Sequence, residues 1–292
     1  MKEKEVQQVL PPPPAHMVGD GFRVHNFFPN GYDMRPDRMS PFYLLDYNAR
    51  IDFTPREEPR GVGVHPHRGF ETVTIAYQGK VQHHDSRGNK GVISPGDIQW
   101  MTAGAGILHK EYHESEFSRK GGPFQVVQLW VNLPAKDKMT PPKYQTITNE
   151  RSPKYILPEQ AGVVEVIAGE YEGTKGAATT FTEIEMYNIR LNPGARIQFS
   201  LPEEYNTGIL VIEGQVRVND TDDAPEDYFV LFRNKGERIS VSTASGGLLL
   251  VLSGKPLRES IMAYGPFLMN TKDEILQAFD DLNAGKFGEL ED

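Results

Sequence analysis

Hydrophobic and polar residues alternate with a period of two along much of the chain, which is the pattern of strands with one buried face. Residues 124–134 alternate in this way, and β-branched residues dominate residues 71–77. Turns rich in glycine and proline separate these segments, for example at residues 78–80 and 94–97. The pattern therefore predicts many short strands joined by tight turns.

The same pattern of short strands separated by turns recurs in the second half of the chain. Between residues 136 and 158, lysine, threonine and proline accumulate, which indicates a linker over the surface. Further short strands are expected within residues 162–169, 183–191, 208–218 and 246–252. We therefore expect an all-β protein with two β-barrels packed together, spanning residues 19–135 and 159–265.

Helical periodicity is found near the end of the chain, within residues 266–292. Thr271 and Glu274 have the spacing of a capping box. An apolar stripe follows, made of Ile275, Leu276, Phe279 and Leu282, and Gly285 is suited to end the helix. The sequence thus predicts a short C-terminal helix that packs across a barrel.

Residues 1–18 are expected to form a flexible arm, because a run of four prolines at residues 11–14 favours extended polyproline structure. A recognition ligand is the alternative reading of this run. The first residues do not resemble a signal peptide, and the chain contains no stretch of about 18 consecutive apolar residues. We expect a cytoplasmic protein without a membrane span.

The net charge, the lack of cysteine and the positions of the histidines limit the kinds of partner and metal site that the chain can have. The net charge of −9 disfavours direct nucleic-acid binding, which needs clustered lysine and arginine. The chain has no cysteine, so any metal must be held by nitrogen and oxygen ligands. All eight histidines fall within the first 113 residues, which places metal chemistry in the first barrel and leaves the second as support or an interaction surface.

Two short polar pairs stand out in the first barrel. The first is His65 and His67, and the second is His109 and Glu111, which follows a glycine-rich run. Residues two apart in a strand point to the same face and lie roughly 6.6 Å apart along the chain. Two such strands facing each other would offer three imidazoles and a carboxylate, a donor set suited to a divalent first-row metal.

The identity of the fourth ligand stays open at this level. Glu71 is an even number of residues from His65 and His67 and would point to the same face of a strand, but a straight strand would place it roughly 13 Å beyond His67. A turn at Arg68 and Gly69 could bring it back, so spacing only leans towards Glu111.

The remaining histidines of this region are not expected to be ligands. His83 and His84 are adjacent and point to opposite faces, so we expect them at the surface or in hydrogen bonds. His113 is expected at the barrel mouth. Candidates to line the cavity are Phe53, Trp100, Met101, Gln128 and Trp130, although core packing is the default for the aromatics.

Several long motifs resemble the signature of the pirin family, within the cupin superfamily. They are residues 65–74 (HPHRGFETVT), 95–104 (PGDIQWMTAG) through 109–111 (HKE), and 128–134 (QLWVNLP). Residues 265–271 (GPFLMNT), with Glu274 and Ile275, are similar to the pirin C-terminus, so the resemblance runs from about residue 20 to 288. Departures are the proline-rich arm and Ala105, where many relatives carry arginine, a change that would alter the pocket entrance.

The resemblance implies two cupin domains of jelly-roll type, with metal only in the first. Pirins bind iron through three histidines and a glutamate, which map by motif to His65, His67, His109 and Glu111. Glu71 matches the carboxylate that ordinary cupins use and pirins do not. The implied cofactor is one divalent transition metal, iron first, with nickel, manganese, cobalt, copper and zinc as alternatives.

The resemblance implies one of two kinds of activity. Some members cleave flavonols such as quercetin with dioxygen, and here Glu111 would take the proton of the 3-hydroxyl as the catalytic base. Others are redox- or metal-sensing regulators that bind a transcription factor or a metabolic enzyme, with Arg68 as the natural reporter, although an ordinary surface salt bridge is the simpler reading of that residue. A metal protein acting on another enol or phenol is a third reading. We expect a monomer with a small phenolic substrate and dioxygen, and leave a protein partner open.

Overall fold

The structure is a computed structural model that describes residues 1–291, and the chain divides into two compact units. We call the first the N-terminal unit; it contains residues 13–37, 42–149 and the chain from Arg258 onward. The C-terminal unit contains residues 1–12, 38–41 and 150–257. Each unit is built from one large and one small antiparallel sheet, so the expected all-β class with two similar halves is confirmed.

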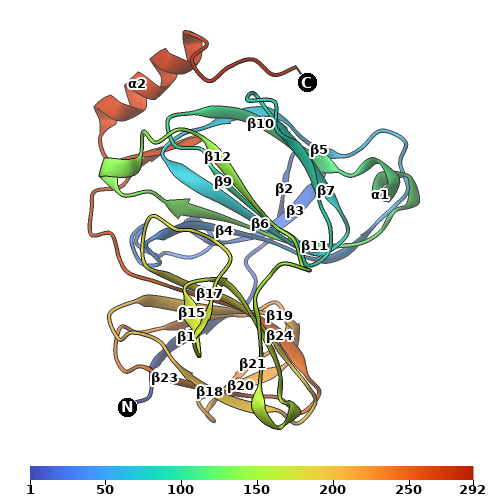
Figure 1. The fold of residues 1–292 in the computed structure, drawn as a ribbon, viewed down its shortest axis with the longest axis vertical. Coiled ribbons are helices and arrows are strands. Elements are labelled where there is room, and N and C mark those ends of the chain that lie inside the picture. Colours follow the sequence, from blue (N-terminus) through green and yellow to red (C-terminus); the bar gives the residue numbers. More distant parts are fainter. Residues whose placement is uncertain (292) are drawn as a thin grey trace. The chain divides into compact units, whose positions relative to one another are not determined.

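The N-terminal unit contains a seven-stranded sheet in the order β12-β9-β6-β11-β4-β3-β2 and a four-stranded sheet in the order β5-β10-β7-β8 (Figure 1). The large sheet consists of β2 (His16–Val18), β3 (Phe22–Phe28), β4 (Phe42–Phe53), β6 (Phe70–Gln78), β9 (Ile98–Thr102), β11 (Gly122–Asn132) and β12 (Lys143–Ile147). The small sheet consists of β5 (Gly61–His67), β7 (Val81–Asp85), β8 (Lys90–Ile93) and β10 (Ile107–His113). The remaining elements are α1 (Ser115–Lys120), η1 (Ala135–Asp137), the hairpin of β25 (Met262–Tyr264) and β26 (Phe267–Met269), and α2 (Lys272–Asn283).

The C-terminal unit repeats this plan, with sheets in the orders β1-β22-β19-β24-β17-β14-β13 and β18-β23-β20-β21. Its large sheet consists of β1 (Val6–Leu10), β13 (Lys154–Ile156), β14 (Gly162–Ala168), β17 (Ile184–Leu191), β19 (Asn206–Gly214), β22 (Phe229–Phe232) and β24 (Gly247–Gly254). The other strands are β15 (Glu170–Tyr171), β16 (Thr174–Lys175), β18 (Arg196–Ser200), β20 (Val216–Val218), β21 (Asp222–Ala224) and β23 (Arg238–Ser242), and η2 spans Pro158–Gln160. Alternating side chains from its strands fill one large apolar core.

The expectation of a flexible arm over residues 1–18 was wrong. Strand β1 pairs antiparallel with β22, and Leu10 is buried. Lys4 is also buried, and its ammonium donates to the carbonyl oxygens of Pro202, Glu203 and Gly236 at 2.9–3.3 Å. No strand was predicted here because residues 6–10 form a short, mostly polar segment that is followed directly by four prolines.

The segment 136–158 is likewise not a plain surface linker. It contributes β12, which pairs with β9 in the N-terminal unit, and β13, which pairs with β14 in the C-terminal unit. The change from one unit to the other therefore falls between these two strands, close to residue 150. Neither helix among residues 1–291 has the length and apolar character needed to cross a membrane.

Helix α2 begins at the expected capping box, where the Thr271 side chain accepts from the Glu274 backbone and the Glu274 side chain accepts from the Thr271 backbone. Its buried face differs from the predicted stripe, because Leu276 is 52% exposed whereas Ile275, Ala278 and Asp281 are buried. Positions 275, 278 and 282 lie on one helical face, and Leu276 is turned away from it by about 100°. The expected packing of Ile275, Phe279 and Leu282 into one apolar cluster is confirmed.

Asp281 connects this helix to Arg68, the residue directly after the strand that carries the first histidine pair. It accepts from Arg68 at 2.8 Å, and the Arg68 side chain is only 3% exposed, so the expected surface salt bridge was wrong. Arg68 also donates to the Ala105 carbonyl at 2.7 Å and lies over the Phe287 ring. Hydrogen bonds from Lys286 and Arg68 lower the pKa of Asp281 to about 2.

Leu10→Ala should lower the free energy of unfolding of the C-terminal unit by about 2–5 kcal/mol, because it leaves a cavity under β1. The matched control is Gln8→Ala, at an exposed position of the same strand. Urea unfolding of both variants measures the difference. Equal stability of the two variants would show that residues 6–10 do not contribute to the folded unit.

Asp281→Asn should destabilise the N-terminal unit by about 3 kcal/mol, because a buried guanidinium loses its counter-charge. Since the carboxyl pKa is lower in the folded state, the stabilisation is complete above pH 4 and is lost as the pH falls towards 2. The variant should therefore show a flatter decline of stability over that range. Asp280→Asn, at the exposed neighbouring position, is the control; thermal unfolding between pH 2 and 7 checks both, and parallel curves for the two variants would contradict the prediction.

Candidate metal centre

The two polar pairs lie on neighbouring antiparallel strands of the small sheet, β5 and β10. His65 is directly opposite His109, and His67 is opposite Ile107. Between His109 and Glu111 the register shifts, so Glu111 is opposite Val62 and β5 contains one extra residue at this point. The register of His65 against His109 places both polar pairs on one face, and the bulge turns Val62 to the same face.

The three imidazoles form one cluster. Their ring centroids are 4.8 Å apart for His65 and His67, 4.2 Å for His65 and His109, and 4.7 Å for His67 and His109. Each ring offers one nitrogen to a common set in which all nitrogens lie within 4.8 Å of one another. The cluster could therefore hold a metal ion, as the sequence predicted.

Backbone carbonyls orient two of these rings. His65 Nδ1 lies 2.8 Å from the Gly63 carbonyl oxygen, which belongs to the bulged segment of β5, and His67 Nδ1 lies 3.5 Å from the Pro266 carbonyl oxygen. A ring that donates through Nδ1 keeps the lone pair on Nε2 for a metal. The carbonyls thus act as the supporting partners that metal-bound histidines usually have.

His109 gives the strongest sign that a ligand is needed. It is 1% exposed, and neither ring nitrogen has a hydrogen-bond partner among the described residues. A buried polar nitrogen without a partner costs about 1–3 kcal/mol, so such groups call for a specific explanation. A metal bound by all three imidazoles would supply it, and the residues present fit this group.

Burial also sets the protonation state of these ligands. Loss of solvent, followed by repulsion from neighbouring imidazoles, lowers the pKa of His67 and of His109 well below the ordinary value. Both rings are therefore neutral at pH 7. The neutral imidazole is the form that binds metals.

Glu111 lies on the same face and is buried. Gln128 donates to Glu111 Oε2 at 2.8 Å, and the Thr74 hydroxyl is 3.4 Å from Oε1. Burial raises the pKa of Glu111, while the nearby His65 lowers it. Glu111 is not one of the three residues whose donor atoms all lie within 4.8 Å, so its role as fourth ligand stays a prediction.

Glu71, the other candidate, takes a different position. It pairs with Thr102 across β6 and β9 and accepts a 2.6 Å hydrogen bond from the Thr102 hydroxyl. Burial raises the pKa of Glu71 to about 7, and its side chain is outside the lining of the cavity beside the histidines. The turn after His67 leads into the other sheet and does not return Glu71 to the histidine cluster.

A cavity of about 280 Å³ opens beside the histidines and Glu111. Gln128 and Trp130 line it as expected, together with Val18, Phe22, Val24, Asp46, Asn48, Val62, Thr74 and Val126. The other three candidates are not in its lining: Phe53 packs beside Phe124, and Trp100 and Met101 are fully buried in β9. For Phe53 and Trp100, the default expectation of core packing holds, and Met101 is likewise buried rather than in the cavity lining.

The remaining histidines of this region do not join the cluster. His83 is buried and stacks on Tyr144, and burial lowers its pKa to about 4, so the expected surface position was wrong. His84 is hydrogen-bonded to Tyr112. His113 is buried rather than at a barrel mouth; it lies among phenylalanines and donates to the Gly21 carbonyl at 2.8 Å.

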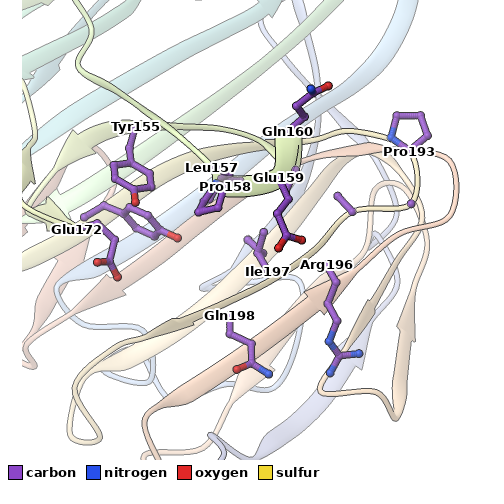
Figure 2. Close-up of a pocket in the computed structure, with 14 residues that line it drawn as sticks. Tyr155, Leu157, Pro158, Glu159, Gln160, Glu172, Pro193, Arg196, Ile197 and Gln198 are labelled. Atoms are coloured by element: carbon purple, nitrogen blue, oxygen red, sulfur yellow. The ribbon is translucent and has the colours of Figure 1, made fainter.

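The C-terminal unit has a cavity of its own, of about 540 Å³ (Figure 2). Tyr155, Glu159 and Glu172 lie around it, with Arg196 and Gln198 on β18. This half of the chain has no histidine, and the described residues show one possible metal-binding group, which is the cluster on β5 and β10. The candidate metal-binding cluster therefore lies in the N-terminal unit.

His109→Gln should reduce bound metal from about one ion per chain to a small fraction, because a structural ligand of the cluster is lost. His84→Gln, on the neighbouring strand but outside the cluster, should keep the wild-type content. Elemental analysis of protein loaded and desalted in parallel measures both. Equal metal content in the two variants would remove His109 from the site.

Comparisons with known proteins find relatives that match most of this chain. The pirin family model matches residues 21–131, and the model of the pirin C-terminal cupin domain matches residues 186–288. A Pseudomonas aeruginosa protein with a provisional quercetin 2,3-dioxygenase name is 46% identical over 93% of this chain and 94% of its own length. A pirin-like protein from Solanum lycopersicum is 39% identical over 87% of this chain and 84% of its own. A crystal structure of quercetin 2,3-dioxygenase from Acinetobacter baumannii is 48% identical, with a TM-score of 0.93 over 99% of this chain and 100% of that one. The chain therefore belongs to the pirin family.

Proposed function

We propose that this protein is a metal-dependent dioxygenase that cleaves flavonols such as quercetin with dioxygen. One observation carries the proposal: three clustered imidazoles, one of which has no hydrogen-bond partner at either ring nitrogen among the described residues, lie beside a cavity that the buried carboxylate of Glu111 also lines. The names of the Pseudomonas and Acinetobacter relatives support the same reaction.

The metal would be held by His65, His67 and His109, with Glu111 as the fourth ligand. When bound, it would act as a Lewis acid that lowers the pKa of a phenolic hydroxyl beside it. Three nitrogens and one oxygen suit several divalent first-row ions. We propose iron on the resemblance to other pirins, and metal analysis of freshly purified protein tests that choice.

Glu111 would take the proton of the flavonol 3-hydroxyl. Burial raises its pKa, which makes it a stronger base than an exposed carboxylate. Gln128 and Thr74 hold its two oxygens and aim the carboxylate at the cavity. Val62, Val126 and Trp130 supply apolar walls that position a flat aromatic molecule and limit access of water.

In the regulatory alternative, the redox state of the ion would switch an adjacent surface, and Arg68 was the expected reporter of that state. Arg68 is buried and paired with Asp281, so no accessible surface is offered at that residue. We propose the enzymatic function because the site geometry and the names of the relatives support it, whereas no observation here favours the regulatory one.

Glu111→Gln should keep bound metal but lose at least about 100-fold in turnover, because general-base catalysis contributes typically 10²–10⁴-fold. Oxygen uptake with quercetin, together with carbon monoxide release, measures the activity. One dioxygen should be consumed for each carbon monoxide released.

Glu71→Gln is the matched control, because Glu71 is also a buried glutamate but lies outside the cavity lining, and glutamine is close to it in shape. It should keep both metal and turnover. Full activity of Glu111→Gln, or loss of metal in Glu71→Gln alone, would reverse the assignment of the two carboxylates. No turnover by wild-type protein loaded with any of several metals would overturn the proposed function.

A further inference from the structure

A row of four polar side chains crosses the sheet that forms one wall of the cavity. Thr74 on β6 is opposite Gln128 on β11, Gln128 is opposite Asp46 on β4, and Asp46 is opposite Asn26 on β3. Residues opposite each other in neighbouring strands share one face of the sheet. Thr74, Gln128 and Asp46 all line the cavity, so the row runs along its wall away from the histidines.

The two ends of this row have different hydrogen-bond partners. Thr74 and Gln128 are bonded to Glu111 and thus belong to the metal end. Asp46 is bonded instead to Asn26, whose Nδ2 donates to Asp46 Oδ1 at 2.7 Å. The Asn26 amide is itself fixed, because its Oδ1 accepts from the backbone nitrogen of Asn30 at 2.9 Å. Asp46 is therefore held in one orientation from outside the cavity.

This arrangement leaves Asp46 Oδ2 without a hydrogen-bond partner among the described residues, in a side chain that lines the cavity. Burial raises the pKa of Asp46, which fits a carboxylate that faces an enclosed space rather than bulk water. A partly buried carboxylate oxygen is a strong acceptor for a hydroxyl donor. The neighbouring Asn48 offers no such group, because its amide oxygen accepts from the Arg23 backbone and its nitrogen donates to the Ala49 carbonyl.

We propose that Asp46 is a specificity-determining residue that accepts a hydrogen bond from a second hydroxyl of the substrate, on a ring remote from the hydroxyl held at the histidines. The inference rests on the proposed function for the identity of the substrate. It assigns the site to polyhydroxylated flavonols rather than to flavonols with the 3-hydroxyl alone. Asp46 takes no part in bond breaking; it orients the molecule along the row.

The test compares two probes, quercetin and 3-hydroxyflavone, which lacks the remote hydroxyls. Binding is measured under nitrogen, so that no turnover occurs, by quenching of tryptophan fluorescence in metal-loaded, full-length protein; Trp130 lines the cavity and serves as the reporter. Wild-type protein should bind quercetin about tenfold or more tightly than 3-hydroxyflavone, as expected for a hydrogen bond to a charged acceptor.

Asp46→Asn should remove this difference. The Asn26 donor selects the amide oxygen of the new side chain, so its NH₂ group would face the cavity and could not accept a hydroxyl proton. Quercetin affinity should fall about tenfold or more, and 3-hydroxyflavone affinity should stay within about twofold. Asp52→Asn, an exposed position on the same strand, is the matched control and should bind both probes as wild type does.

Equal weakening of both probes, no effect on either, or wild-type protein that fails to prefer quercetin would each overturn the inference. If Asp46→Asn does not fold, as judged by circular dichroism, the smaller Asp46→Ser must show the same selective loss. The outcome is separable from the proposed function: selective binding without oxygen uptake would overturn the dioxygenase alone. Oxygen uptake that occurs without a selective effect of residue 46 would overturn the role of Asp46 alone.

Discussion

The structure depends on holding three imidazoles close together on one face of the small sheet, partly without protein partners. Hydrogen bonding within the protein could have satisfied His109, yet both of its ring nitrogens lack a partner among the described residues. That cost is tolerated in folded proteins mainly where a ligand recovers it. The carbonyls of Gly63 and Pro266 hold the rings of His65 and His67, and the hydrogen bond from Arg68 to the Ala105 carbonyl fixes the chain directly after His67.

The C-terminal segment contributes to this centre although it lies far away in the sequence. The Pro266 carbonyl faces His67, and Asp281 on α2 neutralises Arg68, the residue that follows His67. Lys138 adds a further link, because its buried ammonium donates to the carbonyls of Gly69 and Leu268. The hairpin β25–β26 and α2 are thus part of the metal-binding unit, which explains why residues from 258 onward group with it.

Strand parity was enough to predict much of the site from the sequence. Each pair, His65 with His67 and His109 with Glu111, shares one face of its strand because residues two apart do so, and that rule needs no tertiary information. The pairing of His65 with His109 then brings the two pairs to the same face of the small sheet. The choice between Glu111 and Glu71 needed the sheet assignment, since β5 and β6 belong to different sheets. Strand β1 was missed because its pairing with β22 joins residues more than 200 positions apart, and no local pattern encodes such a contact.

Asp46 shows most clearly what the sequence could not supply. Its neighbours, Leu45 and Tyr47, indicate a strand, and a polar residue between them is expected to face away from the core. Whether that face meets solvent or a cavity depends on the small sheet that covers it, and the orientation of the carboxylate depends on Asn26, twenty residues earlier. The metal centre can be predicted from local sequence spacing because its candidate ligands come in pairs on single strands. The groups that would select a substrate are spread one per strand across the opposite wall, so their alignment follows from the register of the large sheet and is absent from any single segment.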